Sequence, residues 1–99
     1  EALRDAAQIL AVDGINAAFV GPGDLALSTG KPANHPDNAV LIDGLLATCR
    51  ERGLPCGTAV GDAAAAREAR ERGFGFVMVS NDCTLFGKAA QALVRGIRA

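Results

Sequence analysis

Three short apolar runs, each ended by a polar corner, constrain the fold of this chain more than any other feature. They occupy residues 15–20, 54–60 and 74–80. Segments with helical periodicity lie before, between and after them. When helices and strands alternate strictly along a chain, the strands join in right-handed βαβ units and form a parallel sheet. The sequence therefore predicts an α/β fold.

Four helices are expected from the apolar periodicity, and several of them carry a start or stop signal. Pro36 suits the first position of a helix, and Asp37 suits the positive end of its dipole. Gly53 and Gly73 are good residues for the position after a helix. The predicted helices cover residues 2–11, 36–52, 63–72 and 84–98.

Two further segments carry structural expectations. We predict that residues 21–35 form a long loop, whose first part contains a short helical turn at residues 25–27. Loops this long are uncommon inside compact domains and are usually functional or disordered. Phe76–Val79 is a continuous apolar run, which is typical of a strand buried on both faces of a sheet.

Two architectures fit three parallel strands: a complete small doubly wound domain, or the last third of a (β/α)8 barrel. Three strands alone leave two unpaired edges. A barrel needs about 250 residues, whereas this chain has 99. The sequence begins with Glu1, and its first residues already have helical periodicity. We therefore expect residues 1–99 to be a single segment, the C-terminal part of a TIM barrel with about strands six to eight.

Composition and charge exclude several classes of protein. A net charge of −1 gives no electrostatic attraction to nucleic acid or to an anionic membrane. No apolar run approaches the ~18 residues of a membrane-spanning helix, and nothing in the sequence indicates secretion. Cys49, Cys56 and Cys83 form neither a zinc motif nor a disulfide framework. We expect a cytoplasmic protein with reduced thiols that binds neither nucleic acid nor membrane.

The corner Gly21-Pro22-Gly23-Asp24 is the leading candidate for a functional site. It follows the first apolar run, so it lies at the carboxyl end of a strand, where parallel α/β proteins bind ligands. Asp24 suits a ligand of a hard cation such as Mg²⁺ or Mn²⁺, and it equally suits a cap for the helical turn that follows. Gly21 and Gly23 allow a substrate carboxylate to approach main-chain N–H groups.

Other polar residues have a structural interpretation beside a functional one. His35, the single histidine, suits either a general base or a residue at a helix start. Asp62 and Asp82 each precede a predicted helix and are expected to cap it, although Asp82 also lies at a strand end. Ser28 and Thr29 have no histidine partner at a triad spacing. The glycines match no nucleotide-binding motif.

Several of these sequence motifs occur together in one enzyme family. The chain resembles the C-terminal part of the metal-dependent class II pyruvate aldolases. That family includes 2,4-dihydroxyhept-2-ene-1,7-dioate aldolase, 2-keto-3-deoxy sugar-acid aldolases and, more distantly, the citrate lyase beta chain. The resemblance extends over essentially the whole chain. It rests on residues 1–3, 9–16 and 19–25, Gly30, His35-Pro36 and residues 76–82.

The resemblance implies a (β/α)8 barrel, usually a homohexamer in which neighbouring subunits exchange the final helix. It implies cleavage of 4-hydroxy-2-oxo acids into pyruvate and an aldehyde. A divalent metal, Mg²⁺ or Mn²⁺ with Co²⁺ as a further candidate, would stabilise the enolate as a Lewis acid. By similarity, Asp24 is a metal ligand and Ala59 belongs to the aldehyde pocket. Gly21, Pro22 and Gly23 match the backbone that lines the pyruvate carboxylate.

The chain also departs from the family pattern. The family's second metal ligand, a glutamate, falls just before Glu1, and its catalytic histidine and arginine belong to the N-terminal half. His35 matches a loop His-Pro word and not the catalytic histidine. We therefore expect no catalytic base within residues 1–99 and no activity from this segment alone. Two alternatives stay open: a lyase acting on CoA thioesters, as in the citrate lyase relatives, or a non-catalytic segment that serves only assembly.

Overall fold

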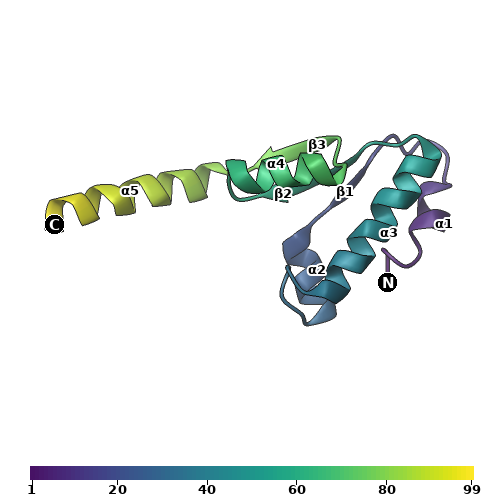
Figure 1. Ribbon diagram of the computed structural model, residues 1–99, viewed down its shortest axis with the longest axis horizontal. Helices are drawn as coiled ribbons and strands as arrows, with labels where there is room; N and C mark the ends of the chain where they lie inside the picture. Colours follow the sequence, from purple (N-terminus) through teal and green to yellow (C-terminus); the bar gives the residue numbers. More distant parts are fainter.

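The computed structural model describes all 99 residues and contains a small parallel sheet with helices around it (Figure 1). The strands β1 (Ala18–Val20), β2 (Cys56–Val60) and β3 (Phe76–Val79) are hydrogen-bonded in the order β1-β2-β3, and both pairs are parallel. The predicted α/β class is confirmed. The helices are α1 (Ala6–Leu10), α2 (Pro22–Thr29), α3 (Pro36–Arg52), α4 (Ala63–Arg72) and α5 (Asp82–Arg98).

The ends of α3 and α4 form as the sequence predicts. His35 precedes α3, and its Nδ1 accepts a hydrogen bond from the Asp37 N–H (3.1 Å). Asp62 caps α4, because its Oδ1 accepts a hydrogen bond from the Ala65 N–H (2.8 Å). Gly53 follows α3 with φ of 66°, a left-handed conformation that glycine adopts without steric cost. The helix-start interpretation of His35 and the cap interpretation of Asp62 are confirmed.

The first part of the chain differs from the prediction in two places. Residues 21–35 do not form a long loop, because α2 occupies most of their first half. Pro22 stands at the first position of α2, where its missing N–H costs nothing, and Gly30 ends the helix with φ of 68°. The helix expected over residues 2–11 is confined to α1 and follows a turn at residues 2–5.

The start of α5 also differs from the prediction. The helix begins at Asp82 and not at Thr84, because Asn81 is its N-cap. Asn81 Oδ1 accepts a hydrogen bond from the Thr84 N–H (2.8 Å). The prediction that Asp82 caps this helix is therefore wrong: the cap is one residue earlier, and Asp82 lies in the first turn.

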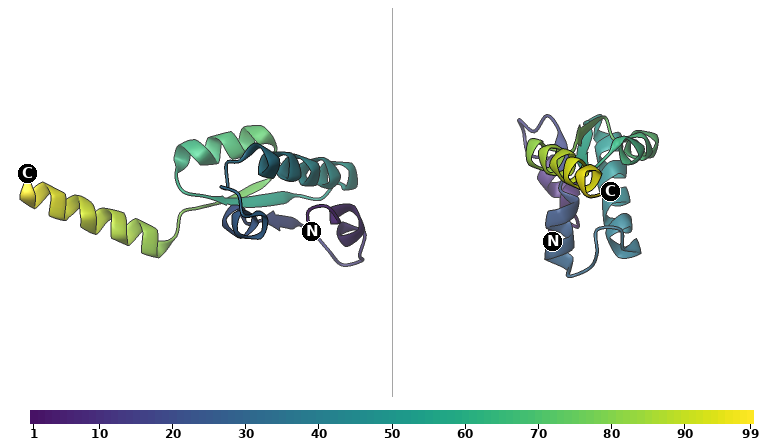
Figure 2. Two further views of the ribbon diagram at one scale, coloured as in Figure 1. Left: turned by 90° about the horizontal axis from the view of Figure 1, so that it is seen from below. Right: turned by 90° about the vertical axis from the view of Figure 1, so that its left-hand side faces the viewer.

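The sheet has one face covered by helices and one open face. Figure 2 shows α3 and α4 on the same side of the strands. Because side chains alternate along a strand, the residues between the buried ones point to the other side. We call that side the open face, and it carries Phe19, Gly57, Ala59, Phe76 and Met78. The core on the covered face consists of Ala6, Leu10, Val20, Ile42, Leu45, Leu46, Cys49, Cys56, Ala69 and Phe74.

The prediction that Phe76–Val79 is buried on both faces is wrong. Phe76 is 43% exposed, Met78 56% and Val79 47%. The physical reason is that Phe76 and Met78 point to the open face, which no helix covers, and that β3 also forms an edge of the sheet.

The helix α5 stands away from the rest of the chain. It extends along the long axis beyond the sheet, and none of its residues is buried (Figure 1). The radius of gyration is 16.4 Å, against roughly 12.6 Å for a compact domain of this length. The accessible surface is 6946 Å², against roughly 5,300 Å² for a folded monomer of this mass. The chain thus leaves exposed a surface that a compact domain buries.

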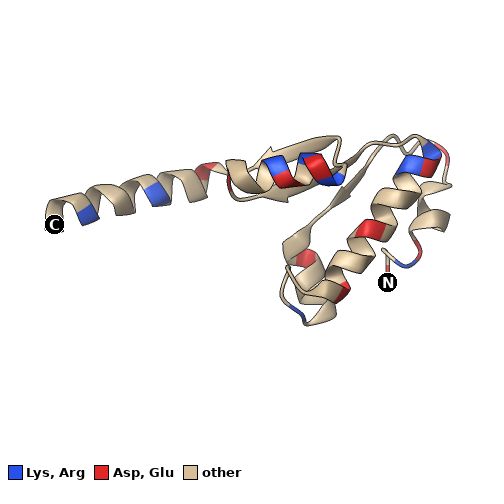
Figure 3. Ribbon diagram, in the orientation of Figure 1, with Lys and Arg blue, Asp and Glu red and all other residues tan.

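Charged side chains are distributed without a large patch of one sign. Acidic and basic residues are mixed on α4, and α5 carries only basic residues after its first position (Figure 3). None of the helices has the length and apolarity that crossing a membrane requires.

Candidate functional site

The carboxyl ends of the three strands meet along one edge of the sheet and surround a hollow of about 270 Å³, the tip hollow. Pro22 and Gly23 follow β1, Ala59 lies in β2, and Ser80 follows β3. The structure thus brings together three of the four residues that were predicted to bind substrate. The fourth, Gly21, is the N-cap of α2 and adjoins Pro22. The tip hollow is lined by uncharged residues only.

Asp24 lies in the first turn of α2, and its carboxylate folds back over Gly21. A Cβ placed on Gly21 would come 2.7 Å from Asp24 Oδ2, closer than such atoms approach in proteins. Glycine at position 21 therefore lets the carboxylate lie against the strand end. The cap interpretation of Asp24 is wrong, because Gly21 is the N-cap and no side chain caps α2. Asp24 is left as an exposed carboxylate.

The start of α2 also presents main-chain donors. The first helical hydrogen bond runs from the Leu25 N–H to Gly21 O (2.9 Å). The N–H groups of Gly23 and Asp24 precede that bond and have no partner within the helix. Pro22 has no N–H, so these two donors form the positive end of α2. Such an end attracts a carboxylate or another anion.

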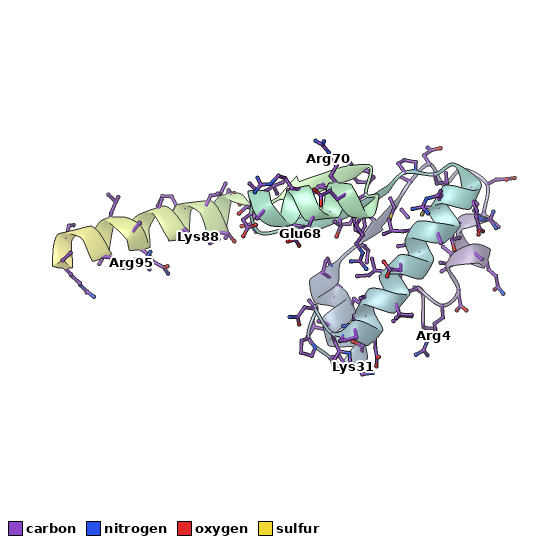
Figure 4. The ribbon with its side chains drawn as sticks, in the orientation of Figure 1. Arg4, Lys31, Glu68, Arg70, Lys88 and Arg95 are labelled. Atoms are coloured by element: carbon purple, nitrogen blue, oxygen red, sulfur yellow. The ribbon has the colours of Figure 1, made fainter.

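A larger hollow of about 680 Å³ lies between the N-terminal segment, α2 and α3, and Asp24 contributes to its wall. Arg4, Lys31 and Asp37 line it as well, and Figure 4 labels the two basic residues. Lys31 Nζ donates a hydrogen bond to Asp37, and this cation holds the pKa of the Asp37 carboxyl below its usual value. Asp24 therefore adjoins one charged hollow and stands next to Gly23, which lines the uncharged one.

The residues of this chain do not complete a metal site. No three His, Cys, Asp or Glu side chains lie close enough together to hold an ion. Asp24 offers carboxylate oxygen, the donor type that Mg²⁺ and Mn²⁺ prefer. The other acidic residues near the strand ends bond to backbone: Asp62 to the Ala65 N–H, and Asp82 to the Cys83 N–H (2.8 Å). These residues therefore supply one carboxylate ligand, Asp24, for a hard cation.

Two polar side chains that the sequence did not single out have shielded atoms without a partner. These atoms are Asn38 Oδ1 and Ser80 Oγ. Asn38 is fully buried, and its Nδ2 donates to Pro32 O (2.9 Å). Ser80 has φ of 61° and is the single non-glycine residue with a positive φ. The sequence signal for Ser80 was a polar residue directly after a strand, and its φ had no sequence signal.

Curated relatives match this chain over almost its whole length. A hydroxypyruvate/pyruvate aldolase from Cupriavidus necator is 37% identical over 99 residues, or 98% of this chain. A 4-hydroxy-2-oxo-heptane-1,7-dioate aldolase from Escherichia coli is 36% identical over 95 residues, or 94% of this chain. The chain spans only 37% and 36% of the lengths of these two proteins. No protein-family model matches it.

Solved structures contain the same arrangement of elements. An HpcH/HpaI aldolase/citrate lyase family protein from Burkholderia cenocepacia has a TM-score of 0.90 and 33% identity, and the match covers 98% of this chain and 38% of that one. An HpcH/HpaI aldolase from Desulfitobacterium hafniense has a TM-score of 0.90 and 28% identity, covering 98% and 39%. The predicted resemblance is confirmed: over almost its whole length this chain is similar to slightly more than a third of each of these HpcH/HpaI-type aldolases.

Proposed function

We propose that this chain forms the last third of a (β/α)8 barrel and supplies one wall of a pyruvate aldolase active site. The proposed reaction cleaves a 4-hydroxy-2-oxo acid into pyruvate and an aldehyde. One observation carries the proposal. Pro22, Gly23 and Ala59 meet at the tip hollow, next to Asp24, in a chain 37% identical to a hydroxypyruvate/pyruvate aldolase.

The exposed surfaces of the sheet support the barrel. β1 and β3 each have one unpaired edge, and the open face exposes Phe19, Phe76 and Met78. In a closed barrel both edges are paired, and inward-facing side chains pack in layers. The strands that complete the barrel precede this chain in our proposal. We call the polypeptide that contains them, followed by residues 1–99, the completed enzyme.

The start of α2 is proposed to bind the pyruvate half of the substrate. The N–H groups of Gly23 and Asp24 donate hydrogen bonds to the carboxylate of the 2-oxo acid, and the helix dipole favours that negative charge. Ala59 lies in the neighbouring strand and borders the aldehyde half, where its small side chain leaves room for a substituent.

Asp24 is proposed to hold one position of a divalent cation, Mg²⁺ or Mn²⁺ as the resemblance implies. A bound divalent cation polarises the keto oxygen of a 2-oxo acid and so stabilises the negative charge that develops on carbon–carbon cleavage. Gly21 leaves room for the Asp24 carboxylate at the strand end, because a Cβ at position 21 would come 2.7 Å from Oδ2 and displace it. The remaining metal ligands and the general base belong to the part of the completed enzyme that precedes Glu1.

The helix α5 is proposed to pack on another copy of the protein. Its apolar residues Phe86, Ala89, Leu93 and Ile97 recur at helical spacing, and Phe86, Leu93 and Ile97 are 79%, 71% and 83% exposed. Such a stripe normally faces a partner. The resemblance implies a homohexamer. Lys88 and Arg95, labelled in Figure 4, belong to the opposite face together with Gln91 and Arg98.

Pyruvate release tests the function. The completed enzyme is mixed with a 4-hydroxy-2-oxo acid and Mg²⁺ or Mn²⁺, and pyruvate is measured by reduction with lactate dehydrogenase and NADH. We expect turnover that a chelator abolishes. Asp24→Asn should lower kcat/KM at least 100-fold, whereas Asp13→Asn, in an exposed turn before β1, should leave it within twofold.

Two other outcomes distinguish the alternatives. Cleavage of a CoA thioester without cleavage of 4-hydroxy-2-oxo acids would replace the aldolase by a citrate lyase type of enzyme, a class that the description of the Burkholderia structure includes. Absence of both activities in a folded, metal-loaded protein would indicate a segment that serves only assembly. The 99-residue chain by itself is expected to release no pyruvate, because one carboxylate holds Mg²⁺ weakly against water.

A further inference from the structure

Ser80 is held in a strained backbone conformation at the carboxyl end of β3. Its φ of 61° lies in the left-handed region. In this region the Cβ of an L-residue is crowded by the backbone, whereas glycine has no Cβ and is not strained. Its N–H donates to Val60 O (2.8 Å), which ties it to the end of β2. Asn81 then caps α5. The residue is thus fixed on both sides, and its conformation follows from the elements that it joins.

The hydroxyl of Ser80 has no structural partner. Its Oγ is shielded from solvent and makes no hydrogen bond, although a hydroxyl has one donor and two acceptor positions to satisfy. Glycine at position 80 would relieve the backbone strain and remove the unpaired hydroxyl together. The backbone therefore gives no reason for serine here. Strained, unsatisfied residues of this kind cluster at ligand-binding sites.

The position of Ser80 indicates which part of a substrate it can reach. It lines the tip hollow together with Gly23 and Ala59. The strand order places β2, with Ala59, between β1 and β3. Ser80 therefore lies beyond Ala59 as seen from Gly23 and Asp24, which are proposed to bind the pyruvate half. The group nearest to Ser80 is then the aldehyde half.

We propose that Ser80 is a specificity-determining residue whose hydroxyl, shielded in this structure, turns toward the tip hollow and binds a hydroxyl group on the aldehyde half of the substrate. This inference rests on the proposed aldolase function. A serine hydroxyl both donates and accepts, so it matches a substrate hydroxyl, which does the same. In the tip hollow around it, Met78 and Val60 are apolar and Asn81 Oδ1 accepts the Thr84 N–H, so Ser80 Oγ is the shielded polar atom of this lining that has no partner. The preferred products are therefore pyruvate and a hydroxyaldehyde.

Two substrates that differ by one hydroxyl test the proposal in the completed enzyme. Cleavage of 4,5-dihydroxy-2-oxopentanoate gives pyruvate and glycolaldehyde, and cleavage of 4-hydroxy-2-oxopentanoate gives pyruvate and acetaldehyde. The ratio of their kcat/KM values measures recognition of the extra hydroxyl. Ser80→Ala removes the hydroxyl and keeps the strain, whereas Ser80→Gly removes both. Thr48→Ala is the matched control, because it removes a hydroxyl that bonds only Gly44 O on α3 (3.0 Å).

We expect both Ser80 variants to lower that ratio about five- to tenfold, the loss of one hydrogen bond to a neutral group, while cleavage of 4-hydroxy-2-oxopentanoate stays within twofold. Ser80→Gly should also raise the melting temperature above that of Ser80→Ala. A ratio that is unchanged, or equal losses with both substrates, overturns the role of Ser80 and leaves the aldolase function standing. Wild-type protein that releases pyruvate from neither substrate overturns the aldolase function, and this inference with it.

Discussion

The ring of Phe76 lies directly over Gly57 on the open face of the sheet. A Cβ at position 57 would come 2.1 Å from Phe76 Cε2 and 2.3 Å from Cζ. The two residues are partners in the pairing of β2 with β3, and Phe19 is the partner of Gly57 on the other side. The centroids of the two phenylalanine rings are 6.0 Å apart. The rings therefore occupy the space above Gly57 that a side chain there would need.

Gly57→Ala should destabilise the completed enzyme by about 1–3 kcal/mol, because overpacking forces the ring or the strand to move. Phe76→Leu in the same molecule should recover part of that loss, since it removes Cε2 and Cζ, the two atoms nearest to the new Cβ. Thermal unfolding of the single and double variants measures the coupling between the two positions. Gly44→Ala is the control, because a Cβ in the middle of α3 meets open space. If both alanine variants unfold alike, the contact between Phe76 and Gly57 is contradicted.

Gly21 and Gly23 give a matched pair of substitutions at the proposed metal ligand. Gly21→Ala would push its Cβ against Asp24 Oδ2, whereas a Cβ on Gly23 meets no atom within 4 Å. We expect Gly21→Ala to lower metal-dependent kcat/KM at least tenfold and to raise the Mg²⁺ concentration needed for half-maximal activity. Gly23→Ala should have a much smaller effect. Activity assayed across a Mg²⁺ titration compares the two, and a larger loss in Gly23→Ala would contradict the placement of the Asp24 carboxylate.

The apolar face of α5 predicts how assembly responds to charge. Leu93→Glu puts a carboxylate in the middle of that face and should dissociate the proposed oligomer, because burying an unpaired charge is strongly unfavourable. Gln91→Glu adds the same charge on the opposite, polar face and should leave the mass unchanged. Light scattering after size exclusion reports the mass of both variants. Equal masses for wild type and Leu93→Glu would show that α5 does not form the interface between copies.

The features that were predictable from the sequence are those set by neighbouring residues. Pro36 and Gly53 mark the ends of α3, and Asp62 marks the start of α4, because helix caps and left-handed glycines act within a few residues. The similarity of the chain to aldolases was predictable from the sequence motifs around Gly21 and Phe76. These local signals were enough to give the element order and the parallel sheet.

Other features were not predictable, because they depend on how segments distant in the chain are placed. β3 is exposed because nothing covers the open face of the sheet and one of its edges has no partner strand, so its apolar run predicted burial that does not occur. The extent of α2 was missed because Gly23 has a low helix propensity, although Pro22 starts the helix. The strained φ of Ser80 follows from how β3 joins α5, and the fold of Asp24 over Gly21 follows from the shape of the strand end.

The buried thiols predict how stability depends on alkaline pH. Cys56 lies in the core, where burial, and then the neighbouring Cys49, raises its pKa from 9.0 to about 12. An unfolded thiol loses its proton near pH 9, while the folded one keeps it until about pH 12. The stabilisation is therefore fully present below pH 9 and is lost as the pH rises from 9 to 12. One such group lowers the free energy of unfolding by at most about 1.4 kcal/mol per pH unit.

Replacing Cys56 should remove that pH dependence. Cys56→Ala should lower stability at every pH, because it leaves a small cavity, but its stability should fall less steeply between pH 8.5 and 10 than that of wild type. Cys83→Ala, at an exposed position on α5, is the matched control and should follow the wild-type curve. Urea unfolding of the three proteins at several pH values gives the slopes directly. Parallel slopes for wild type and Cys56→Ala would show that the buried thiol does not govern the alkaline loss of stability.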